Sequence, residues 1–118
     1  MKTIGVHVDT LEDFMSMNEE HKGSLYIEGA EDIKPKLGGL TKNYRATDTT
    51  ILYLQDNHDE NTKEISETPD FVNTFPSHAK RGTKGAQFIK ETMPLNPYVI
   101  AWDAPGSVSY THLTLPTN

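Results

Sequence analysis

Short apolar clusters separated by polar stretches run along most of the chain. Residues 3–8 form a β-branched and apolar run that stops at Asp9, which is typical of a short buried strand whose carboxyl end opens into a loop. Residues 49–55 (TTILYLQ) have a nearly continuous apolar centre, and residues 98–102 (YVIAW) form a third run. We therefore predict three strands, the second buried on both faces of a parallel sheet.

Two segments between these runs have helical periodicity. The first carries an apolar stripe that consists of Ile33, Leu37, Leu40 and Tyr44. Asp32 is its predicted N-cap, and Pro35 is tolerable only in the first turn. The second covers residues 83–93, with Thr83 as its cap and an apolar face that consists of Ala86, Ile89 and Met93. Both are predicted to be helices.

The predicted order of strand, helix, strand, helix and strand implies right-handed crossovers. We therefore expect an α/β fold, a three-layer, Rossmann-like parallel sheet with helices on both faces, in truncated form. The loop between residues 13 and 29 is predicted to be irregular, as is the polar, acidic segment 56–78. A loop as long as the second is usually functional or disordered.

Residues 107–118 (SVSYTHLTLPTN) do not continue this pattern. They resemble translated read-through of a sequencing adaptor, so we predict one domain over residues 1–106 and a non-native tail over residues 107–118. The natural protein is then expected to continue further. The alternative is a genuine Thr-rich edge strand.

Composition and charge exclude several classes of partner and of chemistry. The chain has 118 residues, a formal net charge of −6 and no cysteine. Nucleic acid and anionic membranes both need clustered Lys and Arg, so neither is an expected partner, and a small neutral or cationic ligand fits better. Disulfides, thiolate metal sites and a cysteine nucleophile are excluded within these residues. The N-terminus lacks the features of a secretory signal, so we expect a cytoplasmic protein.

Candidate catalytic and metal-binding residues follow the ends of the predicted strands. Asp9 ends the first predicted strand, and Asp56 and His58 follow the second. The carboxyl ends of parallel strands meet at one edge, where ligands collect. Asp56 and His58 point to the same side of an extended chain, and an oxygen with a nitrogen ligand suits zinc or a similar ion. His78 is the best candidate for the third ligand.

Other interpretations of these residues stay open. Asp56 and His58 could belong to a solvated loop, and Asp9 could be a loop anchor. Further ligands could come from the exposed acidic run, namely Glu60, Glu64 and Glu67. The segment 81–85 (RGTKG) could bind an anion, although a tight turn is the favoured reading. His7 and His21 have no partner evident from the sequence.

Four blocks together resemble a known family. Residues 8–14 (VDTLEDF) resemble the Val-Asp-x-Gln-x-Asp-Phe signature that begins nicotinamidases and related cysteine hydrolases of the isochorismatase-like superfamily. Residues 23–33 resemble their loop and first helix entry, and residues 55–58 (QDNH) their Thr-x-Asp-x-His turn. Residues 75–88 (FPSHAKRGTKGAQF) resemble their aromatic-Pro-x-His-Cys-x-x-Gly-Thr segment. The blocks occur in family order.

This resemblance implies that residues 1–106 are the N-terminal part of such a hydrolase domain. Asp9 would be the triad carboxylate that takes a proton from the nucleophilic cysteine. Asp56, His58 and His78 would bind a divalent metal, with zinc expected.

The substrate implied by the resemblance is a small amide, nicotinamide, which is converted to nicotinate and ammonia. Phe14 and Phe75 match the aromatic positions that stack on its ring while the metal and its waters hold the ring nitrogen. A homo-oligomer is a further possibility for the intact protein.

Three positions depart from the family pattern. Leu11 stands where Gln is usual, and Ala79 replaces a Cys that is not the nucleophile. The triad lysine is expected at the end of the third strand, where the sequence has Ala101, Trp102 and Asp103. With no cysteine, the chain as it stands is expected to be inactive. A metal-free relative and a non-catalytic metal-binding domain are the alternatives.

Overall fold

The computed structural model describes residues 3–95 and 99–102. Its elements are β1 (Thr3–Val8), α1 (Glu12–Met15), α2 (Ala30–Ala46), β2 (Thr49–Asp56), the 3₁₀ helix η1 (Lys84–Ala86) and β3 (Val99–Trp102). The strands form a parallel sheet in the order β1-β2-β3. The predicted α/β fold with three parallel strands is confirmed. Tyr98 and the predicted tail at residues 107–118 lie outside the described residues.

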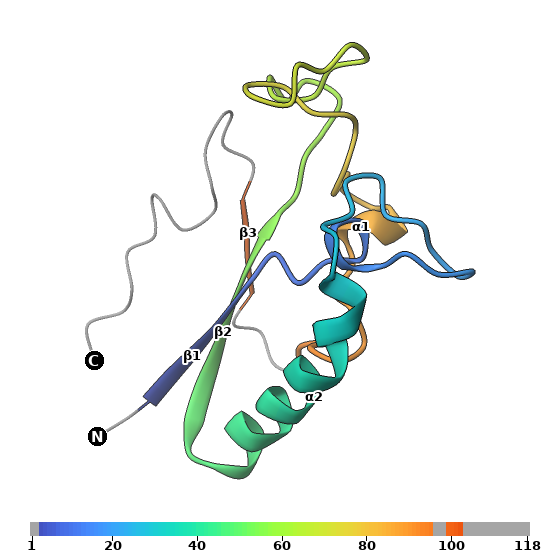
Figure 1. Cartoon of the computed structure of the whole chain (residues 1–118). Coiled ribbons are helices and arrows are strands. Elements are labelled where there is room, and N and C mark those ends of the chain that lie inside the picture. The colour runs from blue at the N-terminus through green and yellow to red at the C-terminus, as the bar shows by residue number, and fades with distance from the viewer. Residues whose placement is uncertain (1–2, 96–98, 103–118) are drawn as a thin grey trace.

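Helix α2 lies along one face of the sheet (Figure 1). On β1, Gly5 and His7 point toward this helix and are buried, whereas Ile4, Val6 and Val8 alternate with them and are exposed. His7 Nε2 lies 3.0 Å from Thr41 Oγ1 of α2, which joins the two layers. Among the residues that the structure describes, helices cover this face only, so the predicted third layer is not seen here.

The limits and orientation of α2 differ from prediction. Gly29, with a φ of 89°, is the N-cap, and Asp32 lies inside the first turn instead. Pro35 falls in the second turn, where its ring removes one backbone hydrogen bond. The buried face includes Lys34 and Thr41, while two members of the predicted stripe are exposed. The hydrogen bonds that join Thr41 to His7 of β1 and Lys34 to Ser16 therefore determine which side of the helix faces the sheet.

The predicted helix over residues 83–93 is wrong. Only η1 forms, and the Thr83 side chain does not cap it. Gln87 O accepts from Glu12 N at 2.9 Å, and Ile89 N donates to Thr10 O at 3.0 Å. These backbone groups bond to a distant segment instead of to their own helical turn. Phe88 and Ile89 are both buried in this non-helical segment.

Two small apolar clusters make up the described core. The first lies between the sheet, α2 and the segment after η1 and consists of Leu11, Ile51, Tyr53, Ala79 and Phe88. The second lies under the start of α2 and consists of Met15, Ala30 and Ile89. Ala79 thus ties the turn after His78 to the core. No helix in the described ranges is long and apolar enough to cross a membrane.

Candidate metal centre

The ends of β1 and β2 place two carboxylates side by side. Asp9 follows β1 in a left-handed conformation, with a φ of 53°. Its backbone N–H donates to Leu54 O at 2.8 Å, and its Oδ1 accepts from Asp56 N at 2.8 Å. The positive φ turns the Asp9 side chain off the strand and toward the end of β2. Asp9 and Asp56 therefore meet at the carboxyl edge of the sheet.

His58 and His78 meet because the chain folds back beside the extension of β2. His58 N donates to Ala79 O at 3.0 Å, and Arg81 N donates to His58 O at 2.8 Å. The two imidazole rings lie edge to face with centroids 4.9 Å apart. One ligand atom from each of Asp56, His58 and His78 lies within 4.8 Å of the others. The structure thus brings the three predicted ligands together.

The chemistry of this donor set fits a zinc ion. Pro76 O lies 2.7 Å from His78 Nδ1 and can only accept, so Nδ1 carries the proton and Nε2 keeps its lone pair for a metal. Burial also lowers the pKa of His78, which favours the neutral ligand form. Two imidazole nitrogens and one carboxylate oxygen make up a common set of protein ligands at catalytic zinc sites.

A fourth side chain, that of Glu64, also lies at this ligand cluster. Glu64 is buried, and its Oε1 lies 3.1 Å from His58 Nε2, while Asp56 Oδ2 lies 3.4 Å from that nitrogen. Glu60 and Glu67, the other two candidates from the sequence, are exposed. Of the three, Glu64 is thus the one that lies at the His58 ring.

Asp9 has the electrostatics of a proton acceptor. Burial raises its pKa to about 7, and the negative charge of Asp56 adds to this effect. A carboxyl group with a pKa near neutrality can both take up and release a proton under ordinary conditions. The arrangement therefore combines a ligand cluster with a carboxylate suited to general base chemistry.

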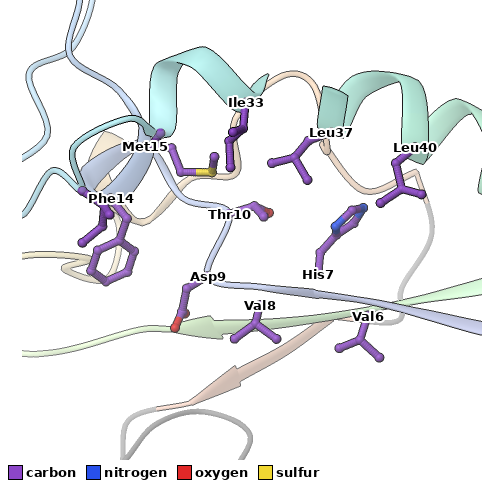
Figure 2. Close-up of a pocket in the computed structure, with 12 residues that line it drawn as sticks. Val6, His7, Val8, Asp9, Thr10, Phe14, Met15, Ile33, Leu37 and Leu40 are labelled. Carbon is purple, nitrogen blue, oxygen red and sulfur yellow. The ribbon is translucent and has the colours of Figure 1, made fainter. Parts of the chain in front are cut away.

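Aromatic side chains and an apolar groove border this centre. The rings of Phe14 and Phe75 lie 5.5 and 6.2 Å from that of His78, centroid to centroid. Figure 2 shows Asp9 and Phe14 at one end of a groove that runs between β1 and α2. The groove has a volume of about 600 Å³, and its walls include exposed apolar residues of both elements, such as Val6 and Leu40.

The other residues that the sequence analysis singled out have structural roles in the fold. The segment 81–85 forms a tight turn, in which Thr83 Oγ1 donates to Lys80 O, and only the three-residue 3₁₀ helix η1 begins there. His7 contacts Thr41, and His21 pairs with Asp13, so both have partners after all. Leu11 is fully buried in the apolar core.

Sequence reasoning missed Asp13. Its buried carboxylate accepts hydrogen bonds from His21 and from the backbone of Ala79, directly after His78. The signal available was its place in the block 8–14, where the family signature also has Asp. The structure describes no side chains for Ala101 and Trp102, and Asp103 lies outside the described residues, so the expected lysine position is untested.

Three solved structures of hydrolases have a similar fold. Pyrazinamidase of Pyrococcus horikoshii, in complex with zinc, matches with a TM-score of 0.68 and 24% identity over 90% of this chain and 53% of its own. An isochorismatase-like hydrolase from Alkaliphilus metalliredigens matches with a TM-score of 0.64 and 27% identity over 86% and 51%. Nicotinamidase/pyrazinamidase from Bacillus subtilis matches with a TM-score of 0.62 and 22% identity over 89% and 57%.

No family model and no curated protein matches the sequence. The likeness to solved structures covers most of this chain, while the chain spans about half the length of each of those structures. The resemblance predicted from the four sequence blocks is confirmed at the level of fold: the chain is built like about half of a nicotinamidase or pyrazinamidase of the isochorismatase-like type.

Proposed function

We propose that the chain carries the metal site, the catalytic carboxylate and part of the ring-binding surface of an amidohydrolase that converts nicotinamide to nicotinate and ammonia. The main support is one arrangement: the ligand atoms of Asp56, His58 and His78 lie within 4.8 Å of one another. Asp9 adjoins this cluster through its hydrogen bond from Asp56 N. The zinc-containing pyrazinamidase with the same fold favours the same interpretation.

Asp56, His58 and His78 would hold the metal, with Glu64 as the fourth ligand. Its carboxylate lies 3.1 Å from His58 Nε2, so Glu64 would hold the cation together with His58. When bound, the metal supplies a Lewis-acidic anchor for a nitrogen of the substrate ring. Phe14 would hold the ring by stacking from one side and Phe75 from another.

Asp9 is the proposed base. A cysteine thiol from sequence not present among these 118 residues would transfer its proton to Asp9, and the thiolate would attack the amide carbonyl carbon. The C–N bond then breaks, and ammonia leaves with the proton that Asp9 held. Water hydrolyses the resulting thioester to nicotinate and restores the thiol. Burial raises the pKa of the Asp9 carboxyl group and so favours its uptake of the thiol proton.

Zinc titration of the chain tests the metal site. We expect one ion per chain, and loss of binding in His58→Ala, because this imidazole lies within reach of both carboxylates. Glu64→Gln should weaken binding, whereas the matched variant Glu67→Gln should not, because Glu67 is an exposed acid of the same loop. Binding that survives His58→Ala would show that the ligand assignment is wrong.

The reaction is tested on the product of the complete gene. We expect sequence past Gly106 to supply an in-frame cysteine, and that product to release ammonia from nicotinamide. A stop codon there, with zinc binding but no ammonia release, would favour the non-catalytic metal-binding domain. Ammonia release that persists after removal of the metal would favour a metal-free relative.

A further inference from the structure

We infer that Asp13 is a positioning residue whose carboxylate holds the turn that carries His78 and thereby sets the affinity of the metal centre. The inference rests on the proposed function, because it concerns the same site. Asp13 does not touch the ligand cluster itself. It acts through the backbone of Ala79, which follows His78 directly.

Three hydrogen-bond donors from two segments of the chain converge on the Asp13 carboxylate. Oδ2 accepts from Ala79 N at 2.9 Å, and Oδ1 accepts from His21 Nε2 at 2.8 Å and from Ser24 N at 3.2 Å. The side chain is only 9% exposed. Burial acts to raise the pKa of Asp13, but the hydrogen bonds from His21, Ala79 and Ser24 outweigh it and hold the pKa below its ordinary value. The carboxylate is therefore a charged, well-bonded anchor inside the protein.

Asp13 holds the backbone of Ala79 in a conformation that is unfavourable for an L residue. Ala79 has a φ of 45°, in the left-handed region where a Cβ is crowded. Such a conformation persists only where surrounding contacts over-determine it. The charge-assisted bond to Ala79 N is such a contact, and the bond from His58 N to Ala79 O at 3.0 Å is another. Both backbone groups of Ala79 are thus held.

A glycine makes room for the anchor. A Cβ at Gly85 would overlap Asp13 Oδ2, so any side chain there would displace the carboxylate. The bond to Ala79 therefore depends on Gly85 as well as on Asp13. Asp56 and His58, by contrast, sit at the end of β2 and on its extension, so loss of the Asp13 anchor should release His78 most.

A double-mutant cycle on the full chain separates positioning from general stabilisation. Asp13→Asn has one acceptor oxygen for the three donors and no charge. It should therefore weaken zinc binding about 10- to 100-fold, the usual effect of disturbing a group that orients a ligand. His78→Ala should weaken zinc binding without abolishing it, because Asp56, His58 and Glu64 remain close to one another. In that background Asp13→Asn should have no further effect on affinity, because the group that Asp13 positions is gone. If the double variant instead loses zinc affinity by the product of the two single-variant factors, Asp13 acts on the whole fold, and the inference is overturned.

Cobalt absorption gives a second readout. The visible bands of Co²⁺ bound to Asp13→Asn should differ from those of the wild type, because the His78 ligand is misplaced. Gly85→Ala should reproduce this change, since it displaces the carboxylate without removing its charge. Asp70→Asn is the matched control: Asp70 accepts from the backbone of residues 72–74 at the exposed tip of the loop, and its variant should bind as the wild type.

The outcomes also separate this inference from the proposed function. A wild-type chain that binds no zinc would contradict the proposed function. A wild type that binds zinc and loses it in His58→Ala, while Asp13→Asn binds normally, would contradict only the role of Asp13. Where circular dichroism shows Asp13→Asn unfolded, His21→Ala replaces it in the cycle. That variant leaves the Ala79 bond in place and should weaken zinc binding to a smaller extent.

Discussion

Backbone conformation, in addition to spacing in the sequence, orients the candidate site residues of this protein. Asp9 and Ala79 both have a positive φ, and each adjoins the ligand cluster. Asp9 turns its carboxylate toward Asp56, and Ala79 lets the chain reverse after His78. Non-glycine residues in this conformation are uncommon and tend to occur at functional sites. Their presence at both borders of the cluster supports the proposed active site.

Replacement of Asp9 by Asn tests its role as the base in the intact protein. The amide oxygen can still accept from Asp56 N, as the carboxylate does at 2.8 Å, but it cannot take up the cysteine proton. Turnover of nicotinamide should therefore fall by about 10²–10⁴-fold or more, with unchanged zinc content. Ammonia release and metal analysis measure the two effects, and activity comparable to the wild type would contradict the triad role.

The helices and strands differ in how well the local sequence pattern predicts their burial. β2 is apolar along its centre and is buried there, as predicted. In α2, Leu37 and Tyr44 pack against the two clusters as the stripe predicts, whereas Ile33 and Leu40 are 45% and 40% exposed. The Ile33 and Leu40 side chains line the groove beside β1 instead (Figure 2).

Gly39 of α2 offers a direct test of helix propensity. Nothing lies within 4 Å of a Cβ placed there, so Gly39→Ala should stabilise the fold by about 0.5–1 kcal/mol, because glycine loses more backbone entropy in a helix. Gly5→Ala is the contrasting variant. Its Cβ would lie 2.5 Å from the ring of Tyr44, so it should destabilise by about 1–3 kcal/mol. Urea unfolding measures both, and equal effects would contradict the packing of α2 on β1.

In the molecule as a whole, the face of β1 that points away from α2 carries exposed apolar side chains. Ile4, Val6 and Val8 are all at least 39% exposed. The core on the other face is small, and polar networks join the elements at the surface. One such network joins α2 to the loop after α1: Glu31 Oε2 accepts from Met17 N at 2.8 Å, and Lys34 Nζ donates to the same oxygen at 3.0 Å.

The Glu31 network predicts how stability responds to acid. The bond from Met17 N, followed by that from the Asn18 side chain, lowers the pKa of Glu31 from 4.5 to about 2. This carboxylate therefore contributes stability above about pH 4.5, and the contribution is lost as the pH falls toward 2. Glu31→Gln should flatten the unfolding free energy against pH in that window, measured with urea. A variant with the wild-type slope would show that the network does not contribute.

Local pattern was sufficient for the strands and for the meeting of Asp9 with Asp56. Apolar runs bury themselves in a parallel sheet, and parallel strands bring their carboxyl ends to one edge. Contacts between distant segments decided the rest. Residues 87–89 pair with residues 10–12 instead of forming a helix, and Glu64 rather than Glu60 or Glu67 lies at His58. The turn that carries His78 depends on Asp13 from another part of the chain. Such pairings leave no periodic trace in a single sequence, because each partner satisfies the other's hydrogen bonds across space rather than along the backbone.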